Sequence, residues 1–137
     1  MNGLIKTNPN KEKAKSITRM ARKTLEMIEN IDMRKFPSNV LKEYYEILRE
    51  LASVLMLLDG YKAQGEGAHK QVIDYIEKNF SEFSEYEIQL MHELRMTRNR
   101  IAYDGFFIRE EYLKRKREDI KEIIGRLLNM IEARLAE

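Results

Sequence analysis

The chain has 137 residues, contains no cysteine and carries a formal net charge of +2 at pH 7. Its length fits one domain with a self-sufficient core, and the lack of cysteine excludes disulfides, thiolate nucleophiles and Cys-ligated metal centres. The two histidines, His69 and His92, lie too far apart in sequence for a His-rich site, and no acidic residues group around them in ligand spacing, so we expect no metal and no cofactor. The longest apolar run, residues 54–58, is too short for a membrane span, and no signal segment is evident. We therefore expect a cytoplasmic protein with no membrane partner.

Apolar periodicity predicts five helices, and no segment shows convincing strand alternation. The expected fold class is all-α, an antiparallel helical bundle forming a single domain over residues 1–137, with residues 1–10 flexible. The first helix is expected over residues 11–31, and its inward stripe includes Met20, Ala21, Met27 and Ile28. We interpret the methionines as gap-filling residues of the core.

The second helix follows Pro37, with Ser38 as its expected N-cap, and ends at Asp59-Gly60. Its apolar stripe is unusually wide, which predicts that it lies at the centre of the bundle or is partly buried against another chain. The glycine-rich segment 64–67 lacks the spacing of a phosphate-binding loop and leads into a third helix over residues 68–80.

The fourth helix begins with a capping-box pattern at residues 84–87 and ends at Asp104-Gly105. Its predicted inward face includes Ile101 and Ala102. The apolar loop 106–108 is expected to fold over the core or to press on a partner subunit. A fifth helix is expected over residues 110–136.

The fourth helix places an arginine on its apolar stripe. Arg98 comes four residues after Leu94, while Asn99 and Tyr103 form an i,i+4 pair beside it. An arginine on an inward stripe needs a partner, an anionic ligand or an opening to solvent. We therefore predict that Arg98, Asn99 and Tyr103 converge near the helix end and form the functional site.

Positive charge is concentrated around this helix. Residues 95–117 contain eight basic and three acidic residues, a local excess of five positive charges. This excess favours a polyanion or phosphate partner. For the run from Lys114 to Arg117, the alternative is an ordinary solvated helix face. The candidate phosphate-binding residues are Arg95, Arg98, Arg100 and Arg109.

The segment from Leu94 to Gly105, LRMTRNRIAYDG, resembles the late-helix signature of HEPN domains, which are small all-α bundles. The order and lengths of the predicted helices also resemble those of the family over most of the chain. Only this one motif makes the resemblance specific. In that family an arginine is followed by a polar residue, three variable residues and a histidine. Arg98 and Asn99 match the first two positions, whereas Tyr103 occupies the histidine position.

Catalytic HEPN proteins are metal-independent ribonucleases, and the resemblance assigns the histidine to chemistry at the ribose 2'-hydroxyl or the phosphate. A phenol, with an ordinary pKa of about 10, is a poor general base at neutral pH. Tyr103 can still donate a hydrogen bond or stack on a base, and Arg98 can still bind phosphate. In the structural alternative, Arg98 pairs with a carboxylate across a dimer interface and Asn99 and Tyr103 complete the network.

The resemblance also implies a homodimer with two copies of Arg98 in one groove, and a nucleotidyltransferase antitoxin as partner. Three functions follow as alternatives. The first is a homodimer that binds RNA or nucleotide phosphates with weak or lost ribonuclease activity. The second is an active endoribonuclease toxin, with Arg98 and Asn99 stabilising the phosphate and Tyr103 as a donor. The third is a non-catalytic protein-interaction module.

Overall fold

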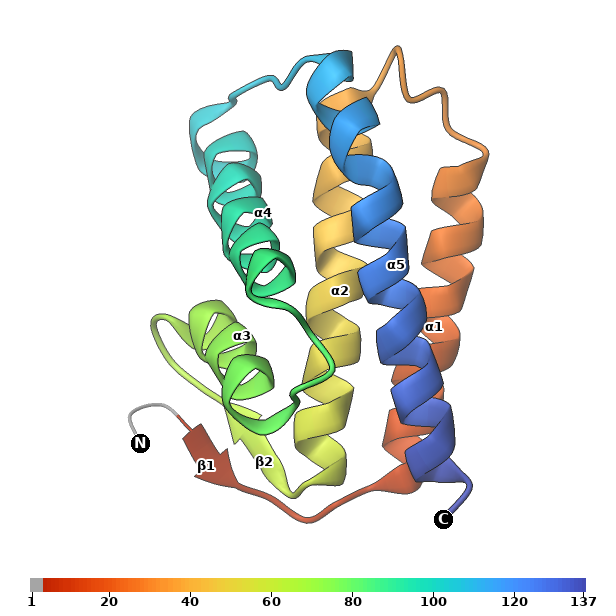
Figure 1. Ribbon diagram of the computed structural model, residues 1–137, viewed down its shortest axis with the longest axis vertical. Coiled ribbons are helices and arrows are strands. Elements are labelled where there is room, and N and C mark those ends of the chain that lie inside the picture. The colour runs from red at the N-terminus through yellow and green to blue at the C-terminus, as the bar shows by residue number, and fades with distance from the viewer. Residues whose placement is uncertain (1–3) are drawn as a thin grey trace.

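The computed structural model describes residues 4–137, which form five helices and one small sheet (Figure 1). The helices confirm the predicted all-α class, and their ends lie within a few residues of the expected positions. The elements are β1 (Leu4–Lys6), α1 (Lys11–Glu29), α2 (Pro37–Leu58), β2 (Tyr61–Ala63), α3 (Ala68–Asn79), α4 (Glu85–Asp104) and α5 (Glu110–Leu135).

Helix α2 is the centre of the bundle. It contacts each of the other four helices, and Leu41, Leu48, Leu51 and Leu55 are completely buried. This arrangement agrees with the wide apolar stripe, because a helix that is apolar around most of its circumference must be covered on several sides.

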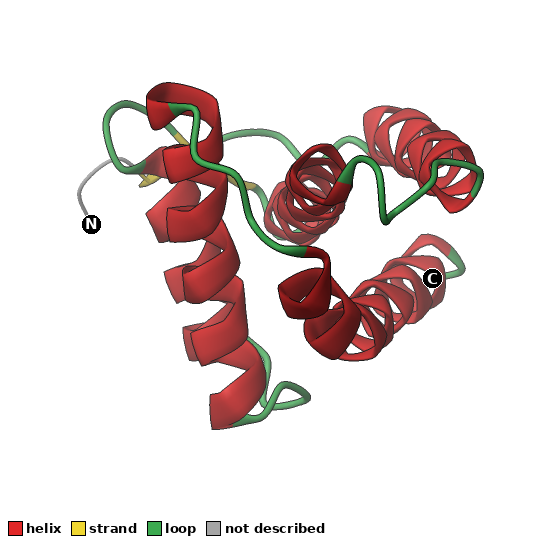
Figure 2. Cartoon of the chain, turned by 90° about the horizontal axis from the view of Figure 1, so that it is seen from above, coloured by secondary structure: helices red, strands yellow, loops and turns green. Residues whose placement is uncertain are grey.

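The long helices differ in direction and tilt. Helix α1 runs antiparallel to α2 and α5, and the chain reaches α4 through the shorter α3 (Figure 1). Seen from above, α4 lies across the bundle, whereas α1, α2 and α5 are viewed nearly end-on (Figure 2). The tilt leaves the last turns of α4 near the edge of the core, where polar side chains can reach solvent.

Two short strands correct the prediction that the chain contains none. Strands β1 and β2 pair antiparallel, with Leu4 opposite Ala63. Each strand has three residues, which is too short to show a clear alternation of polar and apolar residues. Gly60 connects α2 to the sheet with a φ of 88°, and a Cβ atom there would lie 3.2 Å from the Thr7 carbonyl oxygen. Part of the segment expected to be flexible is therefore a strand, while residues 1–3 lie outside the described residues.

The predicted cap of α2 was wrong. Phe36 occupies the N-cap position, and Pro37 begins the helix. Proline has no N–H group, so the first turn has one donor fewer to satisfy. The buried hydroxyl of Ser38 instead accepts a hydrogen bond from the Ile108 N–H, at 2.9 Å, and so joins the start of α2 to the loop before α5.

The inward face of α1 is also displaced from the predicted stripe. Met20 is 63% exposed and Met27 is 51% exposed, so neither fills the core. Ala21 and Ile28 of the predicted stripe are buried as expected, and the small residues Ala14 and Thr18, which were not predicted, are buried with them. Small side chains allow α1 and α2 to approach closely, which turns the longer methionines to the rim.

Helix α4 begins as predicted, with a complete capping box between Ser84 and Glu87. Its other end differs from the prediction, because Ala102 is exposed where the helix extends past the core. In the following loop, Ile108 is buried, whereas Phe107 is 81% exposed. The apolar loop therefore both covers the core and presents an aromatic ring to solvent.

Candidate phosphate site at the end of α4

The three motif residues lie close together on the last turns of α4. The Nη1 group of Arg98 donates to the Asn99 Oδ1 atom at 3.3 Å and to the Tyr103 hydroxyl at 3.4 Å. The Arg98 guanidinium also lies 5.8 Å from the centre of the Tyr103 ring. Tyr103 is 75% exposed, so its ring and hydroxyl are accessible from solvent. The predicted convergence of these side chains is confirmed.

Arg98 has a carboxylate partner within its own chain. Its Nε atom lies 3.1 Å from Oε1 of Glu46, and the two side chains are only 16% and 22% exposed. The other Glu46 oxygen accepts a hydrogen bond from Arg49 at 3.0 Å. Of the three options expected for an arginine on the inward stripe, a partner, an anionic ligand or an opening to solvent, the structure shows a partner. The partner comes from α2, so no second subunit is needed to neutralise the arginine.

Several buried polar atoms around Glu46 have no hydrogen-bond partner among residues 4–137. They are the Tyr45 hydroxyl, the Nε atoms of Arg49, Arg95 and Arg98, and Oε1 of Glu46, whose approach to Arg98 is close but poorly aligned. Burial raises the pKa of Tyr45 to about 12, so its phenol stays protonated. Glu46 thus lies among three arginines, Arg49, Arg95 and Arg98. Glu50 is a second carboxylate near Arg49, so the cluster keeps a smaller excess of positive charge and free donors.

A pocket opens beside this cluster, and we call it the motif pocket. It has a volume of about 340 Å³. Its lining residues are Gly65, Gly67, Ala68, His69, Lys70, Arg95, Asn99 and Tyr103. No carboxylate lines it. Gly67 is the N-cap of α3 with a φ of 75°, and the first turn of α3 has neither a side-chain cap nor an acidic residue. The positive end of the α3 dipole therefore faces the motif pocket together with Arg95.

Two of the predicted phosphate-binding residues lie elsewhere. Arg100 and Arg109 line a separate groove that also contains Arg115. The guanidinium of Arg100 stacks 3.8 Å from the centre of the Phe106 ring. The structure therefore divides the predicted set, because successive arginines along a helix point in different directions. Arg95 lines the motif pocket and Arg98 lies against Glu46, whereas Arg100 and Arg109 line the separate groove.

The basic run on α5 is largely neutralised by carboxylates. Lys114 lies 3.9 Å from Glu110, and Lys116 lies 3.7 Å from Glu93. Arg117 pairs with Glu29 at 3.0 Å and donates to the Tyr44 hydroxyl. These contacts favour the interpretation of the run as an ordinary helix face.

Sequence reasoning missed the position of His69. This residue is the second of α3 and lines the motif pocket with Asn99 and Tyr103, although more than 30 residues separate it from Tyr103 in the sequence. Its ring centre lies 6.0 Å from that of Tyr45. Burial and the nearby Arg49 lower the pKa of His69, so its imidazole is neutral at pH 7. Only the packing of α3 against α4 reveals this neighbour.

The structure also groups acidic residues around the other histidine, contrary to the expectation that none would gather there. Asp74, Glu77 and His92 place ligand atoms within 4.8 Å of one another. The Lys70 ammonium group lies 2.9 Å from Asp74 and already balances one carboxylate. Because the three residues come from α3 and α4, their sequence spacing did not indicate the cluster.

No family model, curated protein or solved structure matches the chain. The resemblance to HEPN domains therefore stays a prediction based on the motif from Leu94 to Gly105. Among residues 4–137, no helix has the length and apolar character needed to cross a membrane.

Proposed function

We propose that the protein is a HEPN-like homodimer that binds RNA or nucleotide phosphates at the motif pocket and has weak or lost ribonuclease activity. The observation that carries this proposal is Arg95, which lines a pocket without a carboxylate and whose buried Nε atom has no hydrogen-bond partner among residues 4–137. Guanidinium groups bind phosphate oxygens through paired donors, and a helix N-terminus adds favourable potential for an anion.

The arrangement favours phosphate binding over cleavage. Tyr103 occupies the position where the resembling family carries its catalytic histidine, and a phenol is a poor base near neutral pH. Its exposed ring suits stacking on a base, while Arg95 and Arg98 suit the backbone phosphate. We therefore expect retention of RNA with little turnover.

The exposed apolar side chains near the motif support the homodimer. Met96 is 54% exposed, and Tyr103 and Phe107 are more exposed still. Met96 and Tyr103 are seven residues apart on α4 and so share a helix face. Exposed apolar side chains on one helix face favour an association surface. We expect sedimentation to give twice the chain mass of 16.4 kDa, and Met96→Ser with Phe107→Ser to shift the protein toward monomer.

Fluorescence anisotropy with a labelled single-stranded RNA tests the binding proposal. Arg95→Ala is the preferred variant because its Nε atom has no partner within residues 4–137, so its loss should not disturb folding. We expect affinity to fall about tenfold, which corresponds to about 1.4 kcal/mol. Lys114→Ala is the matched control because it removes one positive charge outside the pocket. Equal losses in both variants would show that the motif pocket is not the binding site.

RNA binding should weaken with increasing salt, because phosphate binding releases counterions. If RNA is not retained at low salt while a protein partner is captured with no dependence on salt, the protein-interaction module is favoured. The partner proposed from the resemblance, a nucleotidyltransferase, is then the first candidate to test.

A second candidate function, a metal-independent endoribonuclease toxin, is favoured by the position of His69. A neutral imidazole in the motif pocket is a competent general base, which Tyr103 is not. Arg98 and Asn99 would then stabilise the phosphate, and Tyr103 would serve as a hydrogen-bond donor.

Cleavage of labelled RNA in the presence of EDTA distinguishes these two functions. If the toxin function holds, His69→Ala and Arg98→Ala should each abolish cleavage, whereas His92→Ala, which alters the only other histidine, should retain it. If the wild-type protein binds RNA without cleaving it, the toxin function is wrong. Tyr103→His then tests whether restoring the family's residue restores cleavage.

A further inference from the structure

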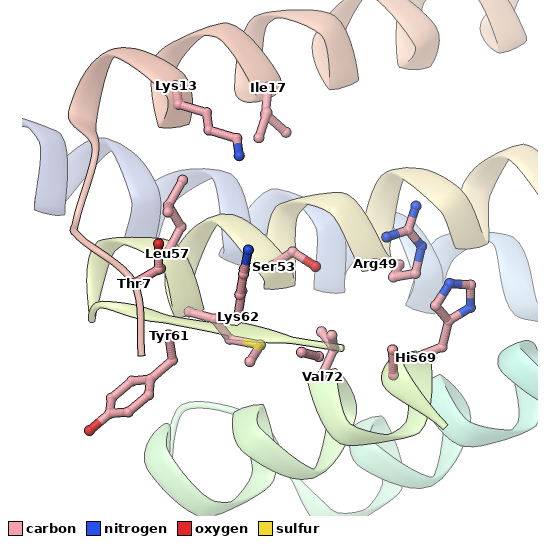
Figure 3. Close-up of a pocket in the computed structure, with 13 residues that line it drawn as sticks. Thr7, Lys13, Ile17, Arg49, Ser53, Leu57, Tyr61, Lys62, His69 and Val72 are labelled. Carbon is pink, nitrogen blue, oxygen red and sulfur yellow. The ribbon is translucent and has the colours of Figure 1, made fainter. Parts of the chain in front are cut away.

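A second pocket lies on the other side of His69, and we call it the Lys13 pocket. It has a volume of about 310 Å³ and is formed by side chains from α1, α2, β2 and α3 (Figure 3). Four basic side chains line it: Lys13, Arg49, Lys62 and His69. The proposed RNA-binding function does not use Lys13 or Lys62.

The charge of the Lys13 pocket is unbalanced. No aspartate or glutamate lines it. Lys13 and Lys62 form no ion pair among residues 4–137. Arg49 pairs with Glu46 through Nη2 at 3.0 Å, so the two lysines carry the uncompensated charge. The four residues come from four different elements, so tertiary packing brings them together and no local charge run explains them. A concave surface lined by one sign of charge concentrates ions of the opposite sign.

The side chains are arranged for a compact anion with an apolar body. In Figure 3 the amino groups of Lys13 and Lys62 point into the pocket from opposite sides, and Arg49 and His69 lie together at one end. Apolar side chains supply much of the remaining lining; they are Ile17, Met56, Leu57 and Val72. Small-molecule sites combine an apolar lining with a few polar groups in this way.

We propose that the Lys13 pocket binds a small organic phosphate monoester, with its dianionic head between the amino groups of Lys13 and Lys62 and its apolar body against Ile17 and Leu57. Two ammonium groups without a carboxylate partner among residues 4–137 match a dianion better than a monocarboxylate, which would leave one positive charge uncompensated. The volume fits a ligand of small-molecule size and excludes a folded nucleic acid. This site is separate from the proposed RNA function, which depends on Arg95 and Arg98.

Isothermal titration calorimetry of the full chain with phenyl phosphate, inorganic phosphate and benzoate tests the proposal. Phenyl phosphate supplies both a dianion and an apolar body, inorganic phosphate lacks the body, and benzoate carries one charge. We expect phenyl phosphate to bind most tightly. Lys13→Ala combined with Lys62→Ala should weaken it at least about tenfold. Lys15→Ala, on the same helix but outside the pocket, should change the affinity less than about twofold.

Absence of saturable phenyl phosphate binding, or equal binding by the double variant, would overturn the proposal. If benzoate binds as tightly as phenyl phosphate, the pocket does not select a phosphate dianion. If inorganic phosphate binds as tightly as phenyl phosphate, the apolar side chains do not contribute to binding. The double variant should bind RNA within about threefold of wild type. Tyr103→Ala, which alters an exposed motif residue, should retain phenyl phosphate binding. Failure of one function therefore does not imply failure of the other.

Discussion

The end of α4 and the start of α5 are both rich in basic residues, but carboxylates neutralise them to different extents. On α5, Lys114, Lys116 and Arg117 each lie within 4.0 Å of a carboxylate. On α4, Arg98 shares Glu46 with Arg49, and Arg95 keeps an unpartnered Nε atom among residues 4–137. A count of charges along the sequence therefore does not give the uncompensated charge that is available to bind a ligand.

The difference arises from the neighbours that each helix meets. The start of α5 runs beside acidic side chains that reach it from α1 and α4, including Glu29 and Glu93. The end of α4 faces α2 and the start of α3, where Glu46 is the carboxylate in contact with Arg98. Positive potential therefore persists at the motif pocket and is reduced along α5.

The largest expected difference between the two regions is in stability. Arg98→Ala leaves the half-buried Glu46 with only Arg49 as partner, and we expect the free energy of unfolding to fall by about 2 kcal/mol. Lys114→Ala removes an exposed ion pair and should change it by less than about 0.5 kcal/mol. Urea denaturation measures both values. Equal losses would mean that the Arg98 pair is as solvent-screened as the pair on α5.

The next prediction concerns the affinity for RNA, which we expect one substitution to increase. Glu46→Gln removes the carboxylate that competes with phosphate for Arg98, while the amide keeps the shape of the side chain. We expect RNA affinity to rise about fivefold, or about 1 kcal/mol. Glu110→Gln, beside Lys114, serves as the control and should have a smaller effect. An unchanged affinity for Glu46→Gln would indicate that Arg98 does not contact the ligand.

Histidine titration gives a further comparison, between the motif pocket and the Asp74 cluster. Burial lowers the pKa of both His69 and His92 below the ordinary value of 6.5. Each histidine therefore binds fewer protons in the folded state near that pH, so its contribution to stability is present above pH 6.5 and is lost as the pH falls. NMR titration with bound RNA should raise the midpoint of His69 more than that of His92, because phosphate stabilises an adjacent imidazolium. A larger shift at His92 would place the phosphate elsewhere.

Much of the fold could be predicted because it depends on local patterns. The wide stripe of α2 predicted its central position, and the residues from Ser84 to Glu87 predicted the start of α4. The exposure of Met20 could not be predicted, since periodicity does not show that Ala14 and Thr18 allow a closer approach of α1 to its neighbour than the longer methionine. The predicted cap of α2 was wrong for a similar reason, because the Ser38 hydroxyl accepts a hydrogen bond from Ile108, which lies 70 positions away in the sequence.

The candidate site was predictable only in the part that lies on one helix. Spacing along α4 placed Arg98, Asn99 and Tyr103 together, and the need for a partner followed from the position of Arg98 on the apolar stripe. The identity of that partner, Glu46, and the presence of His69 depend on how α2 and α3 pack against α4. Residues from different helices have no fixed spacing in sequence, so no single-helix pattern could have found them.

The smallest expected effect is at Arg115, and it tests whether the groove beside α5 contributes to RNA binding. Arg115 lies over the Tyr112 ring, with 5.8 Å between the guanidinium carbon and the ring centre, and it lines the groove that contains Arg100 and Arg109. Exposed charges more than about 8 Å from a ligand are largely screened at physiological salt. Arg115→Gln should therefore reduce RNA affinity less than about twofold, measured by anisotropy beside Arg95→Ala. A loss as large as that of Arg95→Ala would extend the RNA-binding surface from the motif pocket onto α5. The ion pairs of the neighbouring lysines would then not exclude this face of α5 from RNA binding.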